Sequence, residues 1–60
     1  MMYAVWIEID TGEWDYVRES MTDGIRSFTS TSPVKVFETK EDAEFECENW
    51  NTATVVEYKY

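Results

Sequence analysis

The chain has 60 residues, of which thirteen are acidic, five are basic and none is histidine, so its formal net charge is −8 at pH 7. Contacts with phosphates need Lys and Arg, so this balance argues against direct binding of nucleic acid or of an anionic membrane and favours a partner with a basic surface. The length allows a single domain over residues 1–60, and an aromatic fraction of 17% supplies the apolar surface that such a domain must bury.

The first half of the chain predicts a β-hairpin. Residues 2–9 alternate between apolar faces, the turn at 10–13 contains a glycine suited to positive φ, and residues 14–18 form the return strand. We expect Ile9 to lie opposite Trp14 and Ile7 opposite Tyr16, which would gather most of the apolar side chains on one face. The same register sets Glu8 opposite Asp15, an unfavourable pair of like charges.

Residues 19–32 are rich in Ser, Thr, Asp and Gly, and they predict either a long loop or a short extra hairpin arm around Asp23 and Gly24. Pro33 then opens a third predicted strand at 34–37.

Thr39 predicts the N-cap of a helix over residues 40–50, with acidic residues in its first turn. At helical spacing, Ala43, Cys47 and Trp50 share one stripe, which predicts that they face the sheet and that the cysteine is a buried, inert thiol. A last strand is predicted at 53–59. The predicted fold class is therefore α+β, with a small mixed sheet of about four strands in the order β-β-β-α-β and one helix packed on one face.

The chain lacks the residues that several kinds of catalytic and binding site require. The absence of histidine excludes Ser-His and Cys-His nucleophilic sites. A single cysteine cannot form a Cys/His zinc site, and two glycines are too few for a Gly-rich phosphate loop. Glu8, Asp10, Glu13 and Asp15 form either a hard-cation site or a solvated acidic turn. We expect no enzymatic activity and no catalytic, cofactor-binding or metal-binding residue, and hence no cofactor.

One helix covers one sheet face, so the second face is the candidate for partner binding. We expect this face to carry Trp6, Val17, Phe37 and Val55, rimmed by Glu8, Asp15 and Glu57, with Phe45 as a further candidate on the helix. The alternative is that residues 19–32 fold over these side chains.

Residues 33–43 (PVKVFETKEDA) and 50–58 (WNTATVVEY) together resemble a pattern of small uncharacterised bacteriophage-encoded acidic proteins, in which a strand, a Thr-capped acidic helix and a last strand follow one another. The resemblance covers the C-terminal half and implies a short accessory protein that binds and modulates a host protein in the host cytoplasm. The absence of a leader or membrane-span pattern also predicts a cytoplasmic location.

Three functional hypotheses remain open from the sequence. The first is an acidic protein–protein interaction module. The second is a homo-oligomeric structural or accessory protein, such as a homodimer with no separate partner. A lesser version of the first is a nucleic-acid mimic, whose phosphate-like carboxylates belong to Glu41, Asp42, Glu44, Glu48 and the acidic turn. The third is a metal-dependent activity, which requires a cation that shifts the melting temperature of the fold.

Overall fold

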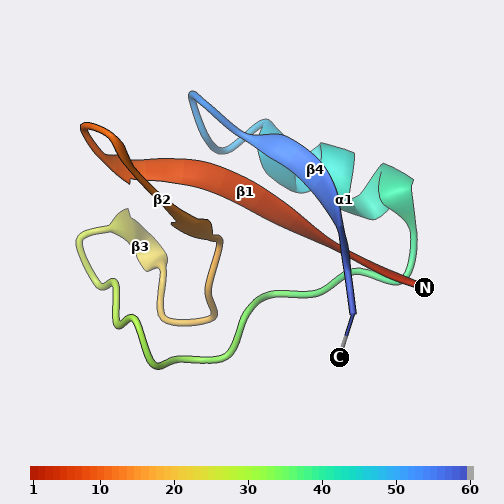
Figure 1. Ribbon diagram of the computed structural model, residues 1–60, viewed down its shortest axis with the longest axis horizontal. Coiled ribbons are helices and arrows are strands. Elements are labelled where there is room, and N and C mark those ends of the chain that lie inside the picture. Colours follow the sequence, from red (N-terminus) through yellow and green to blue (C-terminus); the bar gives the residue numbers. More distant parts are fainter. Residues whose placement is uncertain (60) are drawn as a thin grey trace.

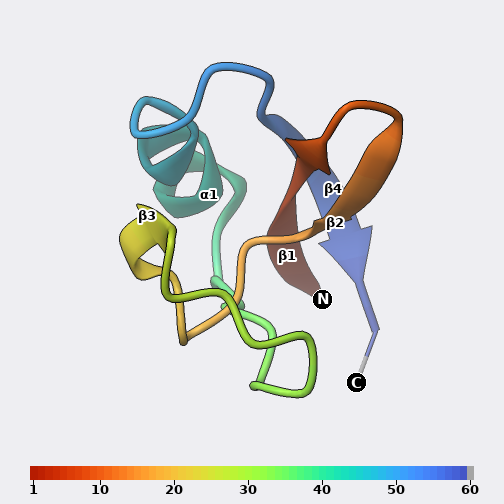
Figure 2. The same cartoon turned by 90° about the vertical axis from the view of Figure 1, so that its left-hand side faces the viewer.

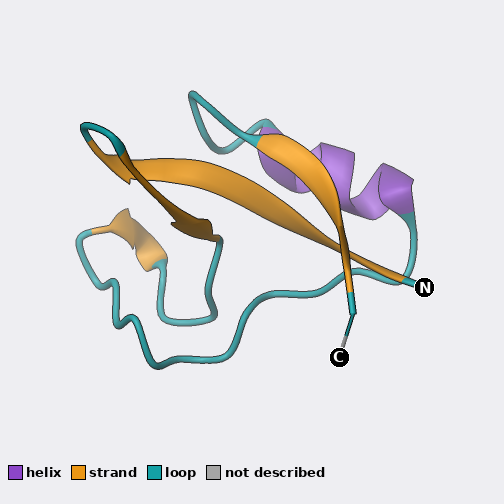
Figure 3. Ribbon diagram, in the orientation of Figure 1, coloured by secondary structure: helices purple, strands orange, loops and turns teal. Residues whose placement is uncertain are grey.

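The computed structural model describes residues 1–59, and its elements are β1 (Met2–Asp10), β2 (Glu13–Tyr16), β3 (Thr22–Ile25), α1 (Lys40–Cys47) and β4 (Thr54–Tyr58). A three-stranded sheet has the order β2-β1-β4, with β1 at its centre and β3 outside it. Both neighbours run antiparallel to β1 (Figure 1, Figure 3). The chain is a small α+β fold with one described helix.

The predicted strand at 34–37 is present only as two single bridges, and the prediction of a mixed sheet is wrong. Phe37 bridges to Tyr3 and Val34 bridges to Arg18, both antiparallel. Residues 34–37 therefore run in the same direction as β4, but β1 lies between the two. Because the segment divides its bonds between β1 and the stretch after β2, no continuous strand forms at 34–37, and the described sheet has three strands.

A bulge in β1 changes the register of the hairpin. Asp10 lies opposite Glu13, as the two-residue turn requires, but Glu8 lies opposite Trp14, so Ile9 is an extra residue in β1. A bulge of this kind shifts every later side chain of the partner strand to the other face of the sheet.

The predicted pairing of β1 with β2 is consequently wrong beyond the turn. Tyr16 lies opposite Trp6, and Asp15 lies opposite Ile7. The expected clash between Asp15 and Glu8 does not arise, because the two carboxylates are not cross-strand partners.

The helix begins where the sequence predicts and ends earlier. The Thr39 hydroxyl oxygen accepts a hydrogen bond from the Asp42 N–H at 3.2 Å, which caps the first turn. Regular helix ends at Cys47, because the N–H of Trp50 bonds three residues back to the Cys47 carbonyl at 3.1 Å. The last predicted turn is thus a tighter, non-α turn.

The core lies between α1 and one face of the sheet. Ala43 is fully buried, and Cys47 and Trp50 pack against the core cluster, so the predicted stripe of α1 faces inward. The buried members of this cluster are Val5, Ile7, Val17, Met21 and Ala43.

Residues 19–32 cover the same side of the sheet as the helix. Met21 is 6% exposed within the core cluster, and Phe28 packs against it. Figure 2 shows α1 and β3 together on one side of the sheet, whereas no described element lies on the other side. The sequence left open whether this segment covers the second face, and it does not.

Candidate interaction surface

The uncovered side of the sheet carries four aromatic side chains in contact, here called the aromatic face: Trp6, Trp14, Tyr16 and Tyr58. The rings of Trp6 and Trp14 are nearly parallel, with an interplanar angle of 12° and centroids 6.5 Å apart. Tyr16 meets Trp6 edge-on at 4.9 Å and Tyr58 edge-on at 5.1 Å. The rings therefore form one continuous cluster across all three strands of the sheet.

The cluster can span the sheet because β1 has a small residue beneath it. Ala4 lies between Met2 and Trp6 on this face, opposite Val56, and is fully buried although no helix covers it. Tyr16 and Tyr58 come from the two outer strands, so their contact has to pass over β1. The methyl group of Ala4 leaves room for the two rings to meet.

Both ends of the aromatic face reach solvent. Trp14 is 44% exposed at the hairpin end, and Met1 is 75% exposed at the other end. A shallow hollow of about 420 Å³ continues the surface there and is lined by Met1, Met2, Tyr58 and Lys59. Between these ends, Trp6, Tyr16 and Tyr58 are half-buried, so the ring cluster is partly accessible along its length. Contiguous accessible apolar surface is typical of binding sites.

Glu8 gives the aromatic face a fixed negative charge beside Trp14. Its carboxylate accepts a hydrogen bond from the Gly12 N–H at 2.9 Å, and its own N–H donates to the Thr52 hydroxyl at 3.1 Å. Gly12 has a φ of 78°, the positive value predicted for the turn. The turn thus holds the carboxylate at the edge of the ring cluster.

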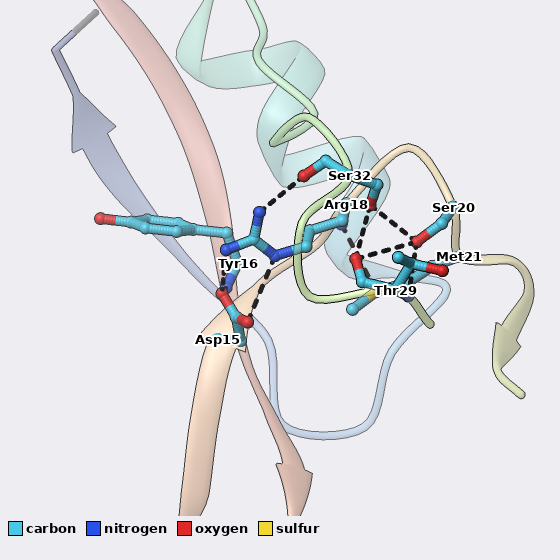
Figure 4. A network of polar contacts seen from close by, with 7 residues as sticks. All are labelled: Asp15, Tyr16, Arg18, Ser20, Met21, Thr29 and Ser32. Atoms are coloured by element: carbon cyan, nitrogen blue, oxygen red, sulfur yellow. Dashed lines mark hydrogen bonds and ion pairs between the residues drawn. The ribbon is translucent and has the colours of Figure 1, made fainter. Parts of the chain in front are cut away.

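An ion pair at the end of β2 fixes the strand that carries two of the rings (Figure 4). The Arg18 guanidinium donates to both carboxylate oxygens of Asp15, at 3.2 and 3.1 Å, and to the Ser32 carbonyl at 2.6 Å. Asp15 also accepts from the Tyr16 N–H at 2.7 Å. In Figure 4 the Tyr16 ring points away from this network, which anchors β2 to the loop.

The eight residues predicted to bind a partner do not form one surface. Trp6 and Glu8 lie on the aromatic face, where they were expected. Val17 is buried, and Phe37 and Val55 pack against the core cluster, so the prediction that they share a face with Trp6 is wrong. The bulge at Ile9 explains why Val17 lies on the core side of the sheet and not on the side of Trp6. Phe37 and Val55 lie on the core side because their partners in β1, Tyr3 and Val5, face the core.

The remaining three predicted residues lie elsewhere. Asp15 is held by Arg18 away from the aromatic face. Glu57 lies opposite Tyr3 at the edge of β4 and is exposed. Phe45 is 74% exposed on α1, on the other side of the molecule from the aromatic rings.

Sequence reasoning missed Trp14, Tyr16 and Tyr58 as members of the surface. The alternation of β4 was visible, and pairing Val55 with Val5 would have placed Tyr58 on the second face. No residue pattern marks the bulge that turns Trp14 and Tyr16 to the same side.

Other polar groups have structural roles. Within residues 1–59, no three or more His, Cys, Asp or Glu side chains are arranged to hold a metal ion. In the acidic turn, Asp10 accepts from the Thr11 N–H at 2.8 Å.

Burial, together with the nearby Glu44 and Glu46 carboxylates, raises the pKa of the Cys47 thiol above its ordinary value of 9.0. The thiol is therefore protonated and weakly nucleophilic at neutral pH.

Among the described residues, no helix has the length and apolar character needed to cross a bilayer. No family model, curated protein or solved structure gives a significant match to this chain. The functional argument consequently depends on the geometry of the aromatic face and on the charge of the molecule.

Proposed function

We propose that this chain is an acidic protein-interaction module that binds a protein partner with a basic surface through its aromatic face. The observation that carries the proposal is the cluster of Trp6, Trp14, Tyr16 and Tyr58 on the sheet face that no described element covers. Tryptophan and tyrosine are enriched at interface hot spots, because each offers a large rigid apolar surface with a polar edge.

Charge supports a basic partner. With a net charge of −8, the molecule attracts cationic surfaces over several ångströms and repels its own copies. Lys or Arg side chains of the partner can lie over the indole rings and reach the Glu8 carboxylate beside Trp14. A host-protein partner and a cytoplasmic location, as the phage resemblance implies, are part of this proposal, as is the absence of enzymatic activity.

Self-association is the second candidate function. The exposed Trp14 and Met1 favour it, because two such faces can pack against each other as the layers of a sandwich. The like charges of two copies oppose it.

The test compares two exposed aromatic residues on opposite sides of the molecule. Tagged wild type, Trp14→Ser and Phe45→Ser are used to capture partners from lysate of the native cell, and the affinity of the captured protein is then measured with purified components. We expect Trp14→Ser to weaken binding by about 30-fold, corresponding to about 2 kcal/mol, and Phe45→Ser to leave it unchanged.

Circular dichroism of both variants checks that the fold is intact. Sedimentation of the wild type alone separates the two candidate functions, since a stable homodimer would favour the second. Loss of binding in Phe45→Ser with full binding in Trp14→Ser would overturn the proposal.

A further inference from the structure

β4 forms an open edge of the sheet. The order β2-β1-β4 leaves β4 with one neighbour, and the two additional bridges of the described chain lie on the other side of β1. An edge strand presents unpaired N–H and C=O groups that can pair with another extended chain.

Hydrogen bonds on the far side of β1 reveal which β4 groups face outward. Tyr3 exchanges both of its backbone bonds with Phe37, at 2.9 and 2.8 Å, and the Val5 carbonyl accepts from the Val17 N–H at 2.8 Å. Tyr3 and Val5 thus direct their backbone groups away from β4.

In an antiparallel pair, residues that lie opposite each other either exchange both hydrogen bonds or direct both away from each other. Glu57 lies opposite Tyr3 and Val55 lies opposite Val5. The N–H and C=O groups of Val55 and Glu57 therefore point out from the open edge, whereas those of Thr54, Val56 and Tyr58 face β1.

The edge is also accessible, and the lysine beside it, Lys40, belongs to α1 and not to the strand. A hollow of about 230 Å³ lies along it, lined by Tyr3, Lys40, Val55, Val56 and Glu57. Natural edge strands are commonly protected by lysine, proline or a bulge. Within Thr54–Tyr58 the sequence has neither lysine nor proline, and its pairing with β1 is regular.

We propose that the open edge of β4 receives an extended segment of the basic partner, which adds to the sheet as a further strand. This inference rests on the proposed function, because it assigns a second contact to the same partner. The net charge of −8 and the exposed Glu57 favour a strand with Lys or Arg at alternate positions and disfavour a second acidic copy. The other side chains of the added strand would lie beside Val56 and Tyr58 and extend the aromatic face.

The probe is a short synthetic peptide of alternating lysine and valine. The control peptide has proline in place of valine, which keeps the charge but does not form a strand. We expect the wild type to bind the lysine–valine peptide about tenfold more tightly than the control peptide. Saturating lysine–valine peptide should slow the amide exchange of Val55 and Glu57 by at least about tenfold.

Two variants at one position separate charge from backbone pairing. Glu57→Gln removes the carboxylate and keeps the outward N–H, whereas Glu57→Pro removes both. We expect Glu57→Gln to retain the preference for the lysine–valine peptide and Glu57→Pro to lose it. If Glu57→Pro does not fold, the exchange measurement on the wild type decides.

Equal affinity of the wild type for the two peptides, or no protection of Val55 and Glu57, would overturn the inference. Protection of these amides by dimerisation without peptide would replace the basic partner by a second copy and would overturn it too. Trp14→Ser should leave the peptide preference intact, because Trp14 lies on the opposite outer strand. The proposed function and this inference can therefore fail separately.

Discussion

At the scale of single residues, Ala4 determines whether the aromatic face is continuous. It is fully buried on a sheet face that no described element covers, and the rings of Tyr16 and Tyr58 meet 5.1 Å apart across its strand. A larger side chain at this position would occupy the space in which the rings meet.

We predict that Ala4→Val lowers the free energy of unfolding by about 1–3 kcal/mol, because overpacking forces neighbouring side chains from their preferred positions. Chemical denaturation measures this change, and near-ultraviolet circular dichroism should report the altered contacts of the rings. Thr54→Val is the matched control, since it adds a branched apolar residue to the exposed end of β4. An Ala4→Val variant as stable as the wild type would contradict the described ring contact.

At the scale of elements, Arg18 joins β2 to the loop that covers the core. Its bonds to Asp15 and to the Ser32 carbonyl connect residues that are far apart in the chain, and both charged side chains are only 19% exposed. The position of the hairpin and that of the loop thus depend on one side chain.

We predict that Arg18→Gln lowers the free energy of unfolding by about 1–3 kcal/mol, because it leaves a half-buried carboxylate without its cation. Arg26→Gln makes the same change of net charge at an exposed position and should have little effect. Urea denaturation of the two variants gives the comparison, and equal losses would mean that only net charge matters.

Elements set by local chemistry could be predicted from the sequence. The turn at Gly12 and the cap at Thr39 depend on backbone and side-chain bonds within a few residues, and both are present in the structure. The strands of the first hairpin and the inward stripe of the helix follow from apolar periodicity in the same way.

Features set by competition between distant segments could not be predicted. The bulge at Ile9 has no local mark, yet it decides which face carries Trp14 and Tyr16. The 34–37 segment has a strand-like sequence, but β1 and the stretch after β2 share its hydrogen bonds. The sequence therefore predicted Trp6 and Glu8 on the second sheet face and left open whether residues 19–32 cover that face, whereas Val17, Phe37 and Val55 were assigned to it wrongly.

At the scale of the whole molecule, the fold covers only one side of the sheet, and acidic residues far outnumber basic ones. α1 and residues 19–32 lie on one side of the sheet and leave the other to solvent (Figure 2). Among residues 1–59, two pairs of opposite charge lie within ion-pair distance, Arg18–Asp15 and Lys35–Glu46. Most carboxylates therefore have no cationic partner, and the repulsion between the eight excess negative charges opposes the compact state.

We predict that the melting temperature rises as NaCl is increased from low concentration to about 0.3 M, because salt screens the repulsion between exposed carboxylates. Differential scanning calorimetry at a fixed pH measures the shift. A melting temperature that falls with added salt would mean that favourable ion pairs outweigh repulsion.

Hydroxyl-radical footprinting of the protein alone and bound to the partner that it captures tests whether the aromatic face is the binding surface. If the aromatic face is the binding surface, oxidation of Trp14 and Met1 should decrease strongly in the complex, while Phe45 on α1 should react as it does in the free protein. Protection of Phe45 with unchanged oxidation of Trp14 would mean that the partner binds α1 and not the aromatic face.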